Sequence, residues 1–221
     1  MTGGNKIFYG LGVSSATSAT ESGSPVVGVR EVQRLQTRAR VFDAALAEIG
    51  RSGLAGADVA AIAAAAGVVR GTFYFHFPTK EYVLVELERA EEAKIVAKLD
   101  TETTRPDDLI SMLRLLVHQV LAAEQRLGPV VFRDMLGLHF SATRPVEDEL
   151  AAHPLAEFVI AAIIDAQAVG RVSSDADPGE LAVIFLTGLF ALLATGVDVS
   201  RTRAALLDRY VTTIVSGMEP R

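Results

Sequence analysis

Cysteine is absent from this chain of 221 residues. Disulfide bonds, thiolate catalysis, thiol redox sensing and cysteine-ligated zinc sites are therefore excluded. A chain without cysteine is compatible with a reducing compartment, and we expect a cytoplasmic protein. Half of the residues are hydrophobic and 22% are charged, a balance typical of a globular protein with a sizeable core.

Sequence signatures of catalysis are also missing. There is no glycine-rich phosphate loop, no nucleophile elbow and no His-Glu-x-x-His helix. Acidic pairs such as Asp107-Asp108 lie where helices are expected to begin, and the helix dipole accounts for negative charge there. Neither His118 nor His139 has metal-ligand spacing to another histidine or acid. We therefore expect a protein that is not an enzyme and has no metal site and no cofactor.

Strand patterns and membrane-spanning runs are lacking too. No segment alternates polar and apolar residues over the length of a strand, and no long internal repeat is present. The longest uncharged apolar run, residues 181–197, falls short of the roughly 20 residues that span a bilayer. Its composition favours a helix buried on most sides, as at a subunit interface. The sequence thus predicts an all-α protein without a membrane span.

Residues 1–35 are expected to form a tail. Residues 14–24 are almost entirely Ser, Ala, Thr and Gly without periodicity, which predicts disorder. Lys6 is the only basic residue before the short apolar stretch at residues 7–13. We therefore favour a disordered extension or an upstream start site over a secretion signal.

The rest of the chain has helical periodicity. A first helix is expected at residues 36–50, where apolar residues recur at i, i+3, i+4 and i+7: Phe42, Ala45, Leu46 and Ile49. Asp58 is a good N-cap for a second helix at 59–65, and Gly67, with an expected positive φ, ends it. Further helices are expected at residues 69–75, 80–99, 107–125, 129–140, 146–169 (interrupted or restarted at 153–154), 178–196 and 201–216.

The net charge of −6 is unevenly distributed. Residues 30–80 hold seven basic and four acidic residues, a local charge of +3, whereas residues 81–221 hold 13 basic and 22 acidic residues, a charge of −9. Steering toward a polyanion depends on the local field, so a small basic module on an acidic body is compatible with DNA binding. The charged side chains of the fourth helix are expected to decorate an exposed face: Glu86, Glu88, Arg89, Glu91, Glu92, Lys94 and Lys98.

The stretch from 66 to 80 has the order that a helix-turn-helix needs. It reads Ala-Gly-Val-Val-Arg-Gly-Thr-Phe-Tyr-Phe-His-Phe-Pro-Thr-Lys. A glycine turn follows a short apolar helix, a second helix opens with small residues, and groups able to hold phosphate come after it. Phe73 and Phe77 are expected in the core.

This stretch resembles the DNA-binding domain of the tetracycline-repressor (TetR) family over residues 36–82. The pattern that carries the resemblance is Ile62-Ala63, Ala66-Gly67-Val68, Gly71-Thr72-Phe73-Tyr74, His76-Phe77-Pro78 and Lys80. The resemblance implies a one-component transcriptional regulator, expected to be a repressor, that binds a palindromic operator as a homodimer. It also implies that residues 83–221 form a helical ligand-binding and dimerisation domain, and that a small molecule releases the operator.

Seven residues are candidates for DNA contact. Arg70 can reach a guanine edge or a phosphate, Gly71 allows close approach of the backbone, and Thr72 can contact a base. Tyr74 and His76 resemble the family's phosphate contacts. Lys80 lies at a helix N-terminus, which itself favours phosphate, and Arg38 is a further phosphate candidate.

Two positions depart from the family pattern. Val69 stands where the family usually has Ser or Thr, and Asp58 stands where it often has Thr. A carboxylate at position 58 caps a helix but repels phosphate. An alternative therefore stays open, in which the chain is a helical ligand-binding or adaptor protein with weakened DNA recognition.

The last two helices are expected to form the homodimer interface, since two such helices from each subunit make a four-helix bundle. The alternative is that their apolar stripes close a monomeric core. The candidate interface residues are Leu181, Phe185, Leu189, Leu192, Leu206, Tyr210 and Ile214. An apolar or amphipathic effector is expected in a pocket between the middle helices. The candidate pocket residues are Met112, Leu116, Phe132, Met135, His139, Phe158 and Phe185.

Overall fold

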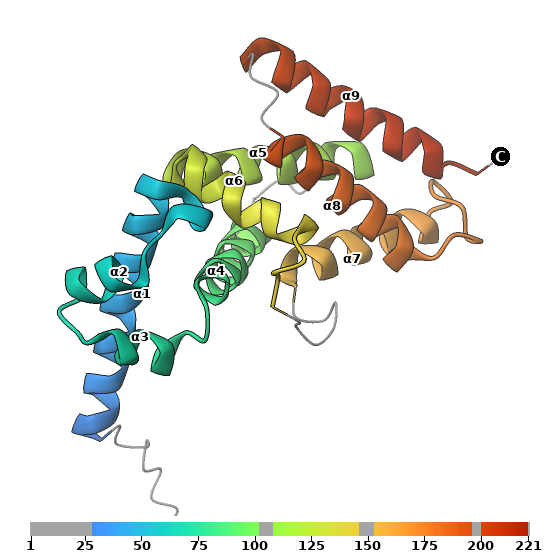
Figure 1. The fold of residues 1–221 in the computed structure, drawn as a ribbon. Coiled ribbons are helices and arrows are strands. Elements are labelled where there is room, and N and C mark those ends of the chain that lie inside the picture. The colour runs from blue at the N-terminus through green and yellow to red at the C-terminus, as the bar shows by residue number, and fades with distance from the viewer. Residues whose placement is uncertain (1–27, 102–107, 146–152, 196–199, 221) are drawn as a thin grey trace, which may run out of the picture.

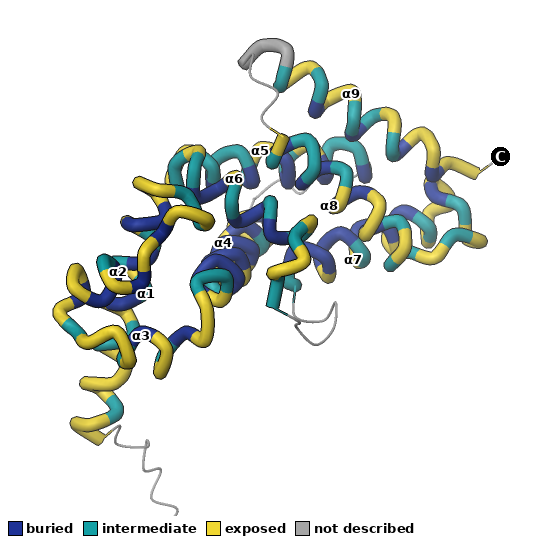
Figure 2. The backbone as a smooth tube through the Cα atoms, in the orientation of Figure 1, coloured by how far each residue is buried: buried dark blue, intermediate teal, exposed yellow. Residues whose placement is uncertain are grey.

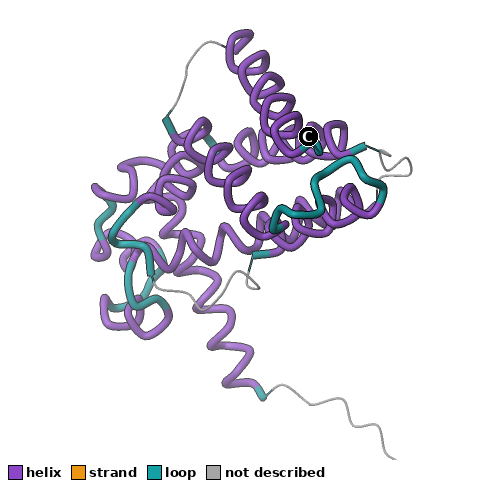
Figure 3. The backbone as a smooth tube through the Cα atoms, turned by 90° about the vertical axis from the view of Figure 1, so that its right-hand side faces the viewer, coloured by secondary structure: helices purple, strands orange, loops and turns teal. Residues whose placement is uncertain are grey.

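The computed structural model describes residues 28–101, 108–145, 153–195 and 200–220, and this part of the chain consists of helices and connecting loops without a strand (Figure 3). The helices are α1 (Val29–Gly56), α2 (Val59–Ala65), α3 (Arg70–His76), α4 (Lys80–Thr101), α5 (Leu109–Leu127), α6 (Pro129–Gly137), the 3₁₀ turn η1 (Leu138–Phe140), α7 (Pro154–Ala168), α8 (Pro178–Ala194) and α9 (Ser200–Met218). The all-α prediction is confirmed.

The helices form a small N-terminal unit and a larger body (Figure 1). Helices α1, α2 and α3 surround a small apolar cluster formed by Val41, Ala45, Val59, Ile62, Ala66, Phe73, Phe77 and Val83. Helices α4 to α9 surround the main core, and α4 runs from one unit into the other. Val83 belongs to the small cluster and Leu84 to the main core, so the expected domain boundary at 82–83 falls inside the first turns of α4.

Helix α1 begins earlier than the sequence predicted. It starts at Val29 rather than at residue 36, so the expected tail is helical at residues 29–35. Most of this first part is exposed (Figure 2). Val29 and Leu35 are among its exposed residues. This part of α1 has no buried side, so its sequence has no amphipathic pattern from which a helix could be predicted. Good helix-forming residues and the exposed Glu31–Arg34 ion pair at i, i+3 account for its helical conformation. Residues 1–27 lie outside the described part.

The predicted capping residue before α2 and the predicted glycine after it are confirmed. The Asp58 carboxylate accepts hydrogen bonds from Ala60 N at 3.0 Å and Ala61 N at 3.3 Å. These bonds satisfy two of the amide groups that a helix start leaves without partners. Gly67 ends the α2 turn with φ of 67°. The other predicted helices agree with the structure within a few residues, except that residues 146–152 lie outside the described part.

Helix α8 is the most apolar helix of the body and packs between α7 and α9 (Figure 1). Its contact with α9 depends on Gly188. The Tyr210 hydroxyl of α9 lies against Gly188 and donates to the Phe185 carbonyl at 2.6 Å.

In the described residues no single helix has the length and apolarity needed to cross a membrane. Only the bent α2–α3 pair, with 97° between its helices, meets those criteria jointly.

Candidate nucleic-acid interface and inner chamber

Helices α2 and α3 form a helix-turn-helix. They meet at 97°, within the range of this motif, and the short turn between them contains Gly67. Phe73 and Phe77 anchor α3 in the small apolar cluster, with exposed fractions of 0% and 1%. The prediction that both lie in the core is confirmed. The Phe77 ring also lies 6.0 Å from the ring of Phe42 on α1. Since these residues occupy one side of α3, the opposite side faces solvent.

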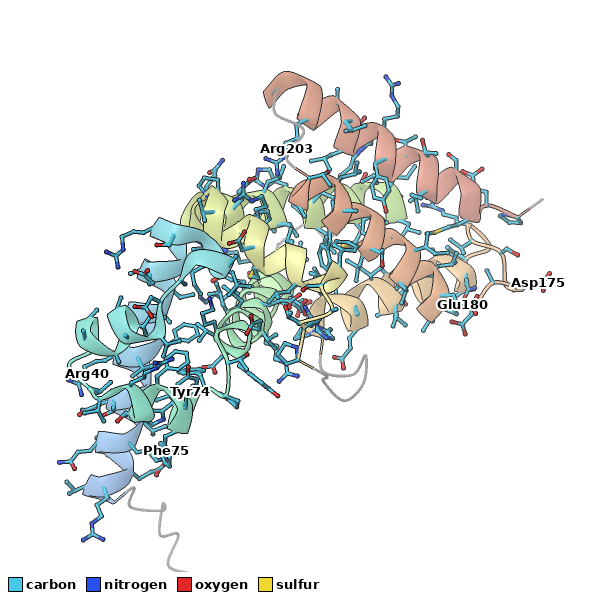
Figure 4. All side chains as sticks on the ribbon, in the orientation of Figure 1. Arg40, Tyr74, Phe75, Asp175, Glu180 and Arg203 are labelled. Carbon is cyan, nitrogen blue, oxygen red and sulfur yellow. The ribbon has the colours of Figure 1, made fainter. Side chains whose placement is uncertain are left out.

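The solvent-facing side of α3 is unusually apolar. Phe75 is 72% exposed and Tyr74 is 45% exposed. Gly71, one turn earlier, has no neighbouring atom within 4 Å of the position that a Cβ would take. Figure 4 shows Arg40, Tyr74 and Phe75 together at this end of the molecule, whereas Asp175 and Glu180 lie at the far end. Large exposed apolar side chains beside a glycine give a surface that can approach another molecule closely.

Phe75 was not among the residues singled out from the sequence. The signal for it was present, because a residue two positions from Phe73 in a helix points to the opposite side. With Phe73 and Phe77 assigned to the core, Phe75 had to be exposed.

Arg70 and Tyr74 form a pair on the exposed face. The Arg70 guanidinium donates to the Tyr74 hydroxyl at 3.4 Å and lies 5.8 Å from the centre of the Tyr74 ring. Among the described residues Arg70 makes no ion pair, so its positive charge is available to a ligand. Thr72 is half-buried on the flank of the same helix.

Two of the predicted phosphate contacts, Lys80 and Arg38, have partners within the protein that hold the N-terminal unit together. The Lys80 ammonium donates to three carbonyl oxygens at the end of α1, those of Leu54 at 2.7 Å, Ala55 at 3.3 Å and Ala57 at 2.8 Å. An ammonium group has three protons to donate, and all three are engaged. The sequence could not show this, because the partners are backbone atoms 23–26 residues away.

Arg38 is engaged in a similar way. It forms a bidentate ion pair with Glu86 of α4, and its guanidinium lies 4.6 Å from the centre of the Phe77 ring. His76, the next phosphate candidate, is half-buried. Burial, followed by the charges of Arg38 and Arg34, lowers the pKa of His76 below its ordinary value. At neutral pH its ring is therefore a hydrogen-bonding group without charge.

The predicted interface residues divide into two groups. Phe185 and Leu189 have exposed fractions of 0% within a single subunit, so the prediction that they face a partner was wrong. They belong to the core, because a helix between two neighbours buries more than one face. The remaining predicted residues are partly buried: Leu181, Leu192, Leu206, Tyr210 and Ile214. On the outer side of α8, Ile184 is exposed.

A chamber of about 310 Å³ opens between α4, α7 and α8, next to η1. Its walls are formed by Glu92, His139, Phe140, Arg144, His153, Ala156, Val183, Leu186, Thr187 and Phe190. A narrow void continues behind it, lined in part by Glu88, Phe132 and Met135. Glu92 and Phe190 line both spaces.

Three of the predicted pocket residues lie around these spaces. His139 lines the chamber, and Phe132 and Met135 line the void behind it. Four others pack in the hydrophobic core away from both spaces, which corrects their assignment to the pocket: Met112, Leu116, Phe158 and Phe185. Helical periodicity identifies buried positions but does not tell a packed position from one beside a cavity.

The acidic residues of α4 also differ from the sequence expectation. Glu88, Glu91 and Glu92 were expected on an exposed face, but their exposed fractions are 2%, 3% and 5%. They continue the inward stripe that includes Leu84 and Ile95. A buried carboxylate is costly unless it has partners. The partners are 35 to 63 residues away along the chain, apart from Lys94, so local sequence patterns could not reveal them.

Each buried acid has its own partners. Glu91 accepts from Lys94 at 2.7 Å and from Arg126 at 2.8 Å. Glu88 pairs with His139 through Oε1 and with Arg144 through Oε2, the latter at 3.0 Å. Burial opposes ionisation of Glu88, but His139 and Arg144 outweigh it and hold the pKa of this carboxyl below its usual value.

Glu92 completes the group. Its Oε1 lies 3.5 Å from His153 Nδ1, and its Oε2 accepts from Leu155 N at 3.3 Å. The hydrogen bond to Glu92 raises the pKa of His153 above its ordinary value. One wall of the chamber is thus charged and hydrogen-bonding, and the opposite wall, formed by Val183, Leu186 and Phe190, is apolar.

Comparisons with known proteins agree with this architecture. Residues 41–87, which contain the helix-turn-helix, match the model of the bacterial regulatory proteins of the tetR family. The chain is 34% identical to the transcriptional regulator AcrR of Shigella flexneri over 85 residues, which span 38% of this chain and 40% of AcrR. It is 28% identical to the transcriptional repressor KstR of Mycolicibacterium smegmatis over 182 residues, which span 77% of this chain and 84% of KstR.

Solved structures show the same fold. Thermus thermophilus FadR, a TetR-family repressor in complex with lauroyl-CoA, superimposes with a TM-score of 0.65 at 20% identity, covering 83% of this chain and 96% of FadR. RolR in complex with resorcinol gives a TM-score of 0.59 at 20% identity, covering 86% of this chain and 91% of RolR. Residues 41–87 are thus similar to the DNA-binding region of the tetR family of bacterial regulatory proteins, and the described helices have the fold of solved TetR-family structures.

Proposed function

We propose that the protein is a transcriptional repressor that binds operator DNA as a homodimer through α3 and leaves it when a small molecule enters the chamber beside α4. The observation that carries the proposal is the exposed face of α3. This face presents Arg70, Gly71, Tyr74 and Phe75 while Phe73 and Phe77 fix the helix from behind. A helix presented in this way can enter the major groove of DNA.

The residues of α3 divide by chemistry. Arg70 can donate two hydrogen bonds to a guanine edge, and Phe75 can contact a thymine methyl group. Tyr74 supports the Arg70 guanidinium and can turn its hydroxyl toward a phosphate. Lys80 and Arg38 support DNA binding indirectly, by holding the helices that position α3, because their own charges are already engaged within the protein.

Replacing Arg70 by Ala is expected to weaken operator binding by about 2 kcal/mol and to relax specificity at one base pair of each half-site. The measurement is fluorescence anisotropy with DNA from upstream of the chain's own gene, over a range of salt concentrations. Lys98→Ala, which removes an exposed charge at the far end of α4, is the matched control and should bind as the wild type does. A loss that is equal for all sequences would remove Arg70 from base reading.

The same titration separates the proposal from its rival. A ligand-binding or adaptor protein with weakened DNA recognition would bind upstream DNA no better than random DNA at low salt. Asp58, which caps α2 on the DNA-binding unit, is the feature that favours this rival, because its carboxylate repels phosphate. A clear preference for an upstream sequence supports the repressor.

The homodimer is proposed to form through the outer face of α8 together with α9. Ile184 on this face is 55% exposed in a single subunit, so a large apolar side chain is left for a partner to cover. Two α8–α9 pairs would make a four-helix bundle around a two-fold axis. Such a dimer presents two copies of α3 to two half-sites of a palindrome.

An Ile184→Asp substitution is expected to weaken the dimer at least about tenfold, because it places a charge in an apolar interface. Analytical ultracentrifugation over a concentration series measures this. Ile164→Asp on α7, where the residue is 49% exposed, is the control and should leave the dimer intact. A dimer that tolerates Ile184→Asp but dissociates in Ile164→Asp would move the interface to α7.

The chamber limits the kind of effector. A volume of about 310 Å³ is at the small end of ligand pockets. It suits a compact molecule with an apolar body and a hydrogen-bonding head, closer in size to the resorcinol bound by RolR than to the lauroyl-CoA bound by FadR. A wider cleft of about 700 Å³ between α1, α4 and α6 is more open and encloses a ligand less well.

Helix α4 connects the chamber to the DNA-binding unit. Glu88 and Glu92 on α4 face the chamber region, Glu86 holds Arg38 of α1, and Lys80 at the start of α4 holds the end of α1. A shift of α4 on effector binding would therefore move α1 and with it α3. This requires that the effector bind the two arrangements with different affinities.

A further inference from the structure

A cluster of metal-binding groups lies where the chamber and the narrow void meet. Glu88 and Glu92 lie one turn apart on α4, and His153 lies at the start of α7. One ligand atom from each of these three residues lies within 4.8 Å of the others. His139 stands next to them, bonded to Glu88 Oε1, with its ring centre 6.4 Å from that of His153.

The carboxylates of Glu88 and Glu92 are oriented in the same way, with one oxygen of each held by a donor and the other directed toward an imidazole. In Glu88, Oε2 is held by Arg144, and in Glu92, Oε2 is held by Leu155 N. The Oε1 atoms of both acids turn instead toward the imidazoles. Such supporting donors fix the orientation of metal-binding carboxylates. This support comes from a cation in an ion pair and from a backbone amide at a helix start.

The burial of these groups also favours a cation. Glu88 and Glu92 are 2% and 5% exposed, and placing two carboxylates side by side in the core is costly. The Arg144 guanidinium balances one of these two charges, and a divalent cation between the carboxylates would balance the one that remains. Oxygen and imidazole ligands together suit zinc and its neighbours among the transition metals, whereas magnesium and calcium prefer oxygen alone.

We propose that Glu88, Glu92 and His153 bind a divalent transition-metal ion, with zinc as the best match, and that its remaining coordination position opens into the chamber. Three protein ligands and an open fourth position are the arrangement of zinc sites that accept a further ligand. His139 orients Glu88. This proposal does not depend on DNA binding, because the site is complete within one subunit.

The test uses the full chain after removal of metal by a chelator. Isothermal titration with ZnCl₂ should give one binding event per subunit, and magnesium should give none. Co²⁺ should produce visible absorption bands that Zn²⁺ abolishes. His153→Ala and Glu92→Gln should each lower zinc affinity at least about 100-fold and remove the cobalt bands, since ligand loss should cost no less than loss of a supporting residue. Glu92→Gln keeps the shape of the side chain, so it tests the site even where His153→Ala perturbs the fold.

Two variants serve as controls. Glu91→Gln changes a buried acid on the same helix whose partners are Lys94 and Arg126, and His118→Ala removes an exposed histidine. Both should bind zinc as the wild type does, with an unchanged helical circular dichroism spectrum. Absence of saturable zinc binding at micromolar concentration would overturn the proposal. So would binding that survives His153→Ala and Glu92→Gln but is lost in His118→Ala.

Discussion

A Gly188→Ala substitution is expected to destabilise the protein by about 3 kcal/mol, at the upper end of the cost of overpacking. A Cβ at position 188 would lie 2.9 Å from Cε2 and Cζ of Tyr210 and closer still to its hydroxyl oxygen. The ring cannot easily move away. It stacks on Phe185 with 5.7 Å between ring centres, and its hydroxyl donates to the Phe185 carbonyl. Burial also raises the pKa of Tyr210 to about 12. Thermal unfolding would measure the loss.

A second glycine provides the control for Gly188→Ala. Gly217 lies in α9 with no atom within 4 Å of the Cβ position, so Gly217→Ala should be neutral or slightly stabilising through helix propensity. In a double-mutant cycle with Tyr210→Ala, the penalty at position 188 should largely disappear. An increase in melting temperature for Gly188→Ala alone would show that α8 and α9 do not pack as described.

A Lys80→Met substitution is expected to lower the free energy of unfolding by about 3–4 kcal/mol. The ammonium group makes three charge-assisted hydrogen bonds, to the carbonyls of Leu54, Ala55 and Ala57. A carbonyl oxygen that loses its donor and is not reached by water destabilises the folded state. Methionine keeps the length and the apolar part of the side chain. Urea unfolding followed by circular dichroism measures the difference.

The Lys80 variant also decides between two roles for this residue. As a direct phosphate contact, Lys80 could be replaced with little effect on stability, and operator binding would weaken equally for all sequences. As the residue that holds the end of α1, it should lower stability and operator affinity together. Lys98→Met, on the exposed side of the same helix, is the control for loss of a positive charge.

Local rules were sufficient for the helix-turn-helix. Asp58 caps α2 and Gly67 ends it because capping and positive φ depend on a few neighbouring residues. Phe73 and Phe77 could be assigned to the core because a spacing of four residues places them on one side of a helix. The same reasoning failed at the start of α1, where a helix forms without an apolar face.

The sequence by itself determined the all-α fold, most helix ends and the helix-turn-helix, because helical period, capping chemistry and a compact motif are all local. Tertiary structure alone decided the roles of the charged residues. It engaged Lys80 and Arg38 within the protein and buried Glu88, Glu91 and Glu92 beside partners from distant helices. The physical reason is that the cost of burying a charge depends on which groups surround it in space, and the spacing of residues along the chain does not contain that information.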